Sequence, residues 1–188
     1  MPSVTRIRAL VGLALALGLA ALATGCVGAH KHHKAKPART LAPVTKRSGC
    51  RLHGGLPDSS CTPGAVLPDV KLRALCTPGY SKRALHVSGM TRELVYAAYR
   101  IKVHPPGRYE IDHLVSLGLG GSNVQANLWP EQAAFPGYHD KNTVENYLHA
   151  QVCHHGLALK TAQREDAENW LATYHRVGSA ALARYRKR

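Results

Sequence analysis

The chain has 188 residues and a formal net charge of +14, from 25 lysines and arginines against 11 acidic residues. The length allows one compact domain, and the absence of an internal repeat excludes a repeat architecture. The excess of positive charge favours nucleic acid or anionic surfaces as partners, although it says nothing about the fold.

Residues 1–25 have the pattern of an export signal. Arg6 and Arg8 precede sixteen apolar or small uncharged residues, which is short of the roughly 20 that span a bilayer. The motif ATGC that ends at Cys26 resembles the lipobox of bacterial lipoproteins, in which this cysteine is lipidated and becomes the N-terminus. We therefore expect a protein anchored by lipid to the outer surface of the cell membrane. A fully secreted protein is the alternative.

The part of the chain after the signal is predicted to have three regions. Residues 26–48 contain the run AHKHHKAKPART, which has no acid and no apolar periodicity and is therefore predicted to be a disordered basic tether. Residues 49–176 are long enough for the folded domain. Residues 177–188 form a basic C-terminal tail, which would add nonspecific phosphate contacts.

Four cysteines remain for the folded domain if Cys26 carries lipid. An even number in an exported chain indicates two disulfides, for which three pairings exist. We favour a short loop and a link from the front of the domain to its back, through the pairs Cys50–Cys61 and Cys76–Cys153. A zinc site of four thiolates is the alternative, but it lacks the CxxC spacing typical of such sites.

The domain is predicted to begin with turns pinned by cysteines, since its first part is dense in Gly, Pro, Ser and Asp. Apolar residues at helical spacing then predict three helices, and alternation predicts one strand between the first and second of them. The helices are expected at about 91–101, 140–152 and 159–175, and the strand at about 109–114. Helices outnumber strands, so the predicted class is α+β.

An acid and a histidine stand together at the end of the predicted strand, at Asp112 and His113. Histidine is the usual general base near neutral pH, and a carboxylate is a hard oxygen ligand for a divalent ion. A loop with three glycines follows and allows a sharp turn. Asn127 returns after this loop, where its amide is expected to hydrogen-bond the loop backbone and hold the histidine in place.

These residues lie in the run EIDHLVSLGLGGSNVQANLWPE, which resembles the HNH endonuclease family over roughly residues 108–152. The resemblance implies a ββα-metal core, in which a short β-hairpin packs on a helix around one divalent ion. It assigns His113 as the general base, Asp112 as the first metal ligand and Asn127 as the residue that braces the hairpin. Flanking helices and the disulfide-pinned N-terminal loops would complete the fold.

The second metal ligand is less well defined, because several residues near the start of the following helix have suitable side chains. We favour Asn142, which fits the family's residue type in the first helical turn. The alternatives are His139, Glu145 and His149. Glu110 shares the strand face of Asp112 and is a possible additional acid, and Lys141 either contacts phosphate or pairs with Glu145 at i, i+4.

The sequence therefore predicts an exported, membrane-tethered, metal-dependent endonuclease that hydrolyses DNA, and RNA as a second substrate, with low sequence specificity. Its cofactor would be one Mg²⁺ or Mn²⁺ ion, or Zn²⁺ or Ni²⁺ if a histidine joins the site. The expected partners are nucleic acid and, through Cys26, the membrane, with no obligate protein partner. The alternative is a noncatalytic surface lipoprotein that binds polyanions or metal on an HNH-like scaffold.

Overall fold

The computed structural model of the protein describes residues 36–186. The predicted α+β class is confirmed, since this part of the chain has six α-helices and two antiparallel two-stranded sheets. The helices are α1 (Leu72–Leu75), α2 (Tyr80–Ala84), α3 (Gly89–Ala98), α4 (Tyr138–His154), α5 (Leu159–Val177) and α6 (Ser179–Leu182). The strands are β1 (Arg39–Thr40), β2 (Ala65–Val66), β3 (Tyr109–His113) and β4 (Leu128–Gln132).

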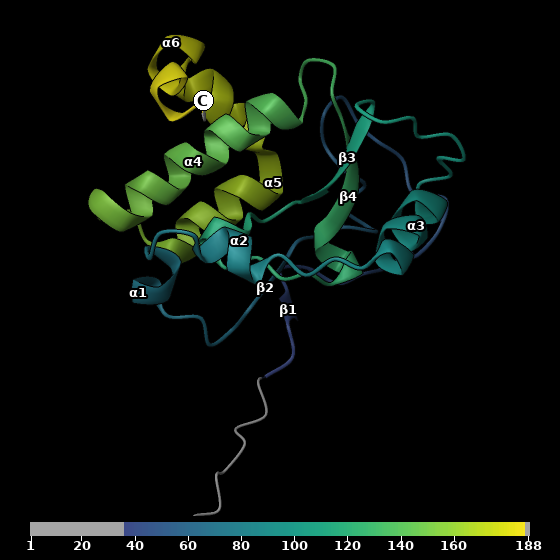
Figure 1. Ribbon diagram of the computed structural model, residues 1–188, viewed down its shortest axis with the longest axis horizontal. Helices are drawn as coiled ribbons and strands as arrows, with labels where there is room; N and C mark the ends of the chain where they lie inside the picture. Colours follow the sequence, from purple (N-terminus) through teal and green to yellow (C-terminus); the bar gives the residue numbers. More distant parts are fainter. Residues whose placement is uncertain (1–35, 187–188) are drawn as a thin grey trace, which may run out of the picture. The chain divides into compact units, whose positions relative to one another are not determined.

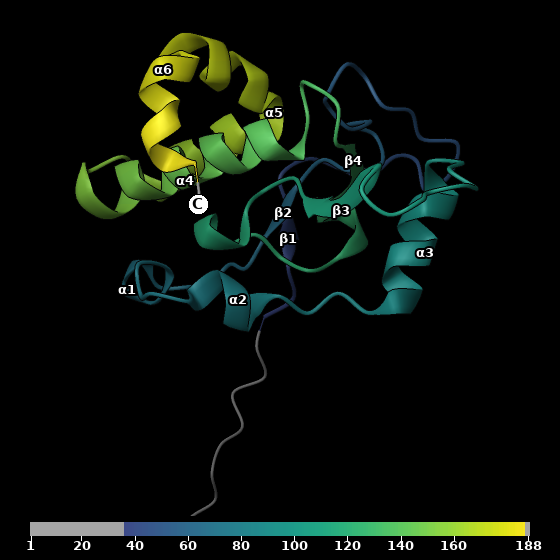
Figure 2. The ribbon, with the colours of Figure 1, turned by 45° about the horizontal axis from the view of Figure 1, so that its top comes forward.

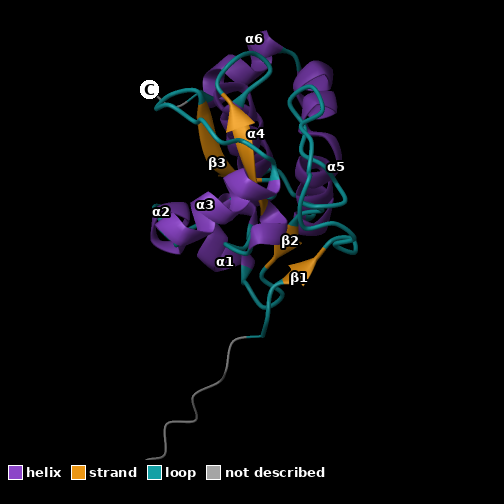
Figure 3. Ribbon diagram, turned by 90° about the vertical axis from the view of Figure 1, so that its right-hand side faces the viewer, coloured by secondary structure: helices purple, strands orange, loops and turns teal. Residues whose placement is uncertain are grey.

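The β3–β4 hairpin is the element around which the larger helices are arranged. It lies between α3 on one side and the packed pair of α4 and α5 on the other (Figure 1). The register pairs Tyr109 with Gln132 and His113 with Leu128, so the hairpin is paired along its full length. The smaller β1–β2 sheet joins the start of the described chain to the region before α1, and Figure 3 shows both sheets in orange.

Two groups of buried apolar residues form the core on either side of the hairpin. The first lies between α3 and the hairpin and includes Val95, Tyr99 and Trp129. The second lies between α4 and α5, because α4 carries buried apolar residues four apart and α5 contributes Trp170, which is 0% exposed. The indole N–H of Trp170 donates to the Gly55 carbonyl oxygen at 3.0 Å, which ties the second core to the N-terminal loops.

Both favoured disulfides are present. Cys50 and Cys61 close an 11-residue separation beside the first core, and both cysteines are buried. Cys76 and Cys153 join the residue after α1 to the last turn of α4 across a separation of 77 residues. The predicted link from the front of the domain to its back is therefore found.

The end of the predicted tether is folded in the structure. Residues 39–40 form strand β1 against β2, and the backbone N–H groups of Thr45 and Lys46 both donate to the Ser60 carbonyl oxygen. The Lys46 ammonium also pairs with the buried loop acid Asp58 at 2.9 Å. The folded domain thus begins about ten residues earlier than expected, because backbone pairing does not require the apolar pattern that this segment lacks.

The expected C-terminal tail is also folded in part. Helix α6 buries Leu182 in the second core, and the side-chain amide of Asn146 on α4 donates to the Tyr185 carbonyl oxygen at 2.9 Å. Figures 1 and 2 show this end of the chain folded back over α4. The predicted signal and the lipidation residue Cys26 lie outside the described residues. Among residues 36–186, no helix is long and apolar enough to cross a membrane.

Candidate functional site

The hairpin brings several acidic side chains to one face. Directly opposed residues of an antiparallel pair point to the same side, and Glu110 is opposite Glu131 while Asp112 is opposite Trp129. Residues two apart on a strand also share a face. Glu110, Asp112 and Glu131 therefore lie on the same face of the hairpin, and Asp112 there meets the first turns of α4.

The loop after β3 is held at both ends by the buried amide of Asn127. Its Oδ1 accepts from the backbone N–H groups of Val115 and Ala65 at 2.9 and 3.1 Å, and its Nδ2 donates to the carbonyl oxygens of Val115 and Ser122. Gly121 lets the loop return this closely, because a Cβ there would lie 1.8 Å from the Val115 carbonyl oxygen. These hydrogen bonds fix the backbone that follows His113.

His113 is oriented by an asparagine whose own orientation is set by the backbone. The side chain of Asn123 donates through Nδ2 to the Ala84 carbonyl oxygen at 2.9 Å and accepts through Oδ1 from the His86 N–H. The same Oδ1 lies 3.0 Å from His113 Nε2, so this ring nitrogen must carry the proton. The lone pair of the neutral ring is then on Nδ1, which makes no hydrogen bond with the described residues.

His113 is neutral at ordinary pH, as a general base must be. Only 5% of the residue is exposed, and this burial lowers the pKa of the imidazole. The neighbouring Asp112 carboxylate and the hydrogen bond with Asn123 act in the opposite direction without reversing the shift.

A buried lysine is the central cation of this region. The side chain of Lys141 is 0% exposed, and its ammonium donates to Asp112 Oδ2 at 2.9 Å, to the His113 carbonyl oxygen at 2.7 Å and to Glu145 Oε1. Burial alone would lower the pKa of this amine, but the surrounding carboxylates raise it well above its ordinary value. Lys141 is therefore charged and pairs with Glu145 and Asp112; it is sealed from the phosphate contact that we considered for it.

Lys141 also decides which of the surrounding acids is ionised. Burial raises the pKa of Asp112, but the Lys141 ammonium and further hydrogen bonds outweigh it, so the pKa of this carboxyl is lowered. The other acids are shifted upward, mainly by burial: the pKa of Glu145 to about 8, that of Asp166 to about 6 and that of Glu131 well above its ordinary value. Asp112 is thus the ionised carboxylate beside His113.

The buried acids outnumber the cation that they share. Glu131 is 0% exposed, and its carboxyl shares a hydrogen bond with that of Asp112, which requires a proton on one of the two acids and favours protonated Glu131 beside ionised Asp112. Asp166 of α5 accepts from the Ser116 N–H at 2.8 Å through one oxygen, while its other oxygen has no partner in the described part of the chain. The raised pKa values of Glu131 and Glu145 favour their neutral, protonated forms, which reduces the negative charge that the Lys141 ammonium has to offset.

The residues considered as second metal ligand are separated by the structure. Asn142 and His139 are both exposed in the first turn of α4, and Glu145 lies in the Lys141 cluster. His149 lies about two turns after Lys141 on α4, which is about 12 Å farther along the helix axis at 1.5 Å per residue. There its Nε2 is 3.1 Å from the Leu75 carbonyl oxygen. His149 lies beside the Cys76–Cys153 disulfide rather than beside Asp112, so it is not a ligand at this site.

The oxygen donors that remain suit a hard divalent ion that keeps most of its water. Asp112 uses Oδ2 for Lys141 and also shares a hydrogen bond with the Glu131 carboxyl, and the Asn142 amide is exposed. Mg²⁺ is commonly bound by one or two carboxylates together with substrate phosphate. The only described group of three His, Cys or acidic ligand atoms within 4.8 Å of one another is Cys76, His149 and Cys153, whose two sulfurs are joined to each other.

Three residues of the site were not singled out by the sequence. Asn123 stands in GGSN, where an asparagine is equally typical of a turn. Glu131 follows a proline and reads as a surface acid, and Arg92 is one of many arginines. Arg92 on α3 lies close enough that its charge lowers the pKa of both Glu110 and His113.

Compared with protein-family models, with curated proteins and with solved structures, the chain gives no match. The fold and the site geometry are therefore the basis for any functional conclusion.

Proposed function

We propose that the protein is an exported, metal-dependent HNH-type endonuclease that hydrolyses phosphodiester bonds in DNA, and in RNA as a second substrate. The observation that carries the proposal is the orientation of His113, which follows the ionised Asp112 in strand β3. Its protonated Nε2 faces Asn123, and its Nδ1 lone pair is unused among the described residues. A binding protein would have no need of a neutral imidazole fixed in one tautomer.

In this mechanism, His113 Nδ1 takes a proton from the water that attacks phosphorus. Its lowered pKa keeps Nδ1 free to accept that proton, and the Asn123 carbonyl oxygen holds the Nε2 proton on the far side of the ring. Asp112 and Asn142 would hold the divalent ion, with Lys141 keeping Asp112 ionised. When bound, such an ion supplies Lewis-acid stabilisation of the charge that develops on the phosphate and the leaving oxygen.

The charge distribution supports a polyanionic substrate held mainly through its phosphates. The chain carries a formal +14, and contacts from lysine and arginine to phosphate convey no sequence information. Arg92 takes the role of phosphate contact that we had considered for Lys141, since it is the partly exposed cation whose field reaches both Glu110 and His113.

Export and surface anchoring are part of the same proposal. Two disulfides in a domain of this size are typical of proteins that fold in an oxidising compartment. The N-terminal pattern before Cys26 supports a lipid anchor there, with full secretion as the alternative. The substrate would then be nucleic acid outside the cytoplasm.

A second candidate is a noncatalytic surface lipoprotein that binds polyanions or metal on this scaffold. The observation that favours it is the 5% exposure of His113, together with an acid cluster that already contains its own ammonium. Such a protein would bind nucleic acid without cutting it.

Nicking of supercoiled plasmid separates the two candidates. The wild-type protein is expected to nick plasmid with Mg²⁺ or Mn²⁺ and to stop when EDTA is added, and His113→Ala is expected to lose at least about 100-fold in rate. His86→Ala is the matched control, because His86 is an exposed histidine close to the site and only its backbone contacts Asn123. Binding without nicking by the wild type would favour the second candidate.

A further inference from the structure

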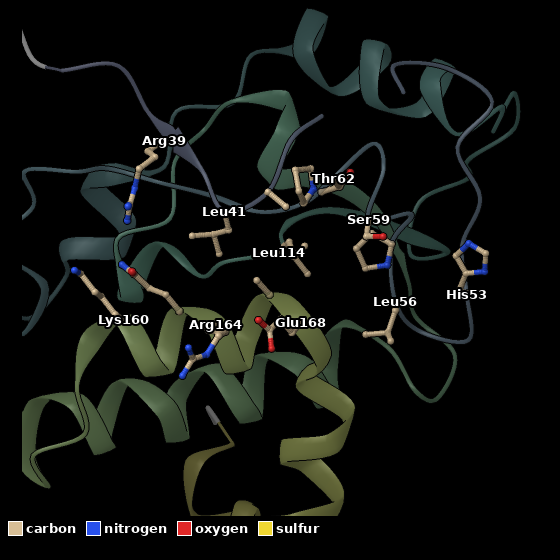
Figure 4. Close-up of a pocket in the computed structure, with 15 residues that line it drawn as sticks. Arg39, Leu41, His53, Leu56, Ser59, Thr62, Leu114, Lys160, Arg164 and Glu168 are labelled. Carbon is tan, nitrogen blue, oxygen red and sulfur yellow. The ribbon is translucent and has the colours of Figure 1, made fainter. Parts of the chain in front are cut away.

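A cavity of about 510 Å³ lies between the N-terminal loops and α5, away from the imidazole of His113. Its walls come from the segment around β1, from the loop between the His53 turn and Pro63, and from one face of α5, with Leu114 between them (Figure 4). The volume is within the range of small-molecule sites, which is about 300–1,000 Å³. Nothing in the proposed nuclease mechanism uses this space.

The walls of the cavity are largely aliphatic, with the polar side chains of His53, Ser59, Thr62 and Gln163 among them. They include Leu41, Leu56 and Leu114, together with alanines and prolines, and the lining contains no Phe, Tyr or Trp. Figure 4 shows Leu41 and Leu114 in the middle of the cavity, between Arg39 and Lys160 at one end and His53 at the other. Proteins that bind unpaired nucleobases commonly stack them on aromatic rings, so this lining suits an aliphatic chain better than a nucleobase.

The rim of the cavity is positively charged. Arg39, Lys160 and Arg164 line it, and Glu168 is the one acid among the lining residues. Each of the three cations is exposed, and none forms an ion pair within residues 36–186. Figure 4 shows the head groups of Arg39 and Lys160 at the same end of the cavity, where together they would face one anionic group.

We infer that this cavity binds an amphiphile with an aliphatic body and an anionic head group, of the class of fatty acids and acyl phosphates. The aliphatic body would lie between Leu41, Leu56 and Leu114, where it replaces water on apolar walls. The carboxylate or phosphate would receive charge-assisted hydrogen bonds from Arg39 and Lys160, and Arg164 would add positive charge at the rim. Both parts of the ligand are needed for binding, because a free anion would have no contact with the apolar walls.

The experiment uses the full chain and dodecanoate as the probe, with isothermal titration calorimetry as the measurement. Dodecanoate is expected to bind with one-to-one stoichiometry. Dodecanol, which keeps the chain but has no charge, is expected to bind at least about tenfold more weakly, because hydrogen bonds to a charged group are lost. Dodecyl phosphate is expected to bind like dodecanoate, whereas inorganic phosphate and adenosine monophosphate are expected not to compete with it.

Charge reversal at the rim tests the location of the site. The double variant Lys160→Glu/Arg164→Glu is expected to weaken dodecanoate binding by about tenfold or more. Acids near the N-terminus of α5 are compatible with the helix dipole, so the variant is expected to fold. The matched control is Lys82→Glu/Lys102→Glu, which makes the same change in net charge at two exposed lysines outside the cavity.

The inference is overturned if dodecanoate does not bind, if adenosine monophosphate displaces it, or if the rim variant and its control bind it equally well. The leucine wall gives an independent variant, since Leu41→Ser at a 37% exposed position is expected to weaken binding without unfolding the domain. His113 does not line the cavity, so His113→Ala is expected to bind dodecanoate like the wild type. Loss of the nuclease proposal would thus leave this one standing.

Discussion

The partner of His113 is an amide rather than a carboxylate, and this choice affects the protonation of the imidazole. A carboxylate hydrogen-bonded to Nε2 would favour the imidazolium, whereas the neutral Asn123 orients the ring with a smaller effect on its pKa. Because Asn123 is itself fixed by two backbone groups, it can hold one tautomer of the base. In the proposed mechanism Asn123 would be a positioning residue, since it would act on the reaction only through His113.

Replacing this amide by an acid is expected to shift the pH dependence of cutting. In Asn123→Asp the new carboxylate raises the pKa of His113, so the base becomes available only at higher pH. The acid limb of the pH–rate profile is expected to move upward by about 1–2 units, with activity recovering at alkaline pH.

Asn169→Asp, on α5, is the control for this change. Its side-chain oxygen caps the Ala172 N–H, and a carboxylate can keep that bond. An unshifted acid limb in Asn123→Asp would contradict the assignment of His113 as the base.

The side chain of Asn127 affects the stability of the loop after β3 rather than the protonation of His113. Asn127→Ala removes four hydrogen bonds and leaves buried backbone groups of Val115, Ser122 and Ala65 without that partner. The free energy of unfolding is expected to fall by about 3 kcal/mol or more, measured by urea denaturation. A loss below about 1 kcal/mol would mean that water replaces the amide and that the loop does not depend on it.

Helix α4 is the element that joins the core to the site. The face of α4 that carries Val144, Leu148 and Val152 packs in the second core. Lys141 lies in the turn before them, where its ammonium contacts Asp112. A buried ion pair usually costs desolvation, so Lys141 and Asp112 are retained here at a cost that apolar side chains would avoid. In the proposed mechanism, the ionised Asp112 would be needed as a metal ligand, which would account for this cost.

Titration of Glu145 gives α4 a pH-dependent contribution to stability. Burial raises the pKa of this carboxyl from 4.5 to about 8, so the folded state resists ionisation that the unfolded chain permits. The free energy of unfolding is therefore expected to fall as pH rises from about 4.5 towards 8. Its slope from this group is at most about 1.4 kcal/mol per pH unit.

The isosteric change Glu145→Gln isolates this contribution, because glutamine does not titrate. The difference between the free energy of unfolding of Glu145→Gln and that of the wild type is expected to shift in favour of the variant from pH 5 to pH 8. Urea denaturation at both pH values measures it. A constant difference between the two proteins over this range would show that Glu145 does not titrate there.

The main elements could be predicted from the sequence, but the burial of α4's polar residues could not. The apolar spacing of Val144, Leu148 and Val152 is a local signal, and it located the helix to within two residues at each end. Lys141 and Glu145 have the i, i+4 spacing of a solvated surface pair. Only the packing of the hairpin against α4 buries them, and a contact between residues 29 apart leaves no periodic signal.

At the scale of the whole molecule, the two disulfides are expected to contribute unequally to stability. Closing a longer loop removes more entropy from the unfolded chain, and the separations here are 77 and 11 residues. Chain entropy gives about 4.5 kcal/mol for Cys76–Cys153 and about 2.8 kcal/mol for Cys50–Cys61. Cys76→Ala/Cys153→Ala is therefore expected to lower the urea midpoint more than Cys50→Ala/Cys61→Ala, and the reverse order would contradict the entropic account.

The boundaries of the domain were the part of the whole molecule least accessible from the sequence. Strand β1 has two residues, and its partner β2 lies about 25 residues later, so neither has the alternation that identifies a strand. The burial of Leu182 could not be predicted either, because this leucine stands in a segment expected to be a basic tail. Two disulfides could be anticipated from four cysteines without CxxC spacing, although this count leaves three pairings open.

The central claim is that the imidazole of His113 is the base that activates water, and chemical rescue tests it most directly. His113→Gly leaves a space where the ring was, and the rate of plasmid nicking is measured with and without added imidazole. The account predicts that the variant is inactive alone and regains activity as imidazole is added, with a pH dependence that follows the added base. Nicking by His113→Gly at the wild-type rate without imidazole would contradict it.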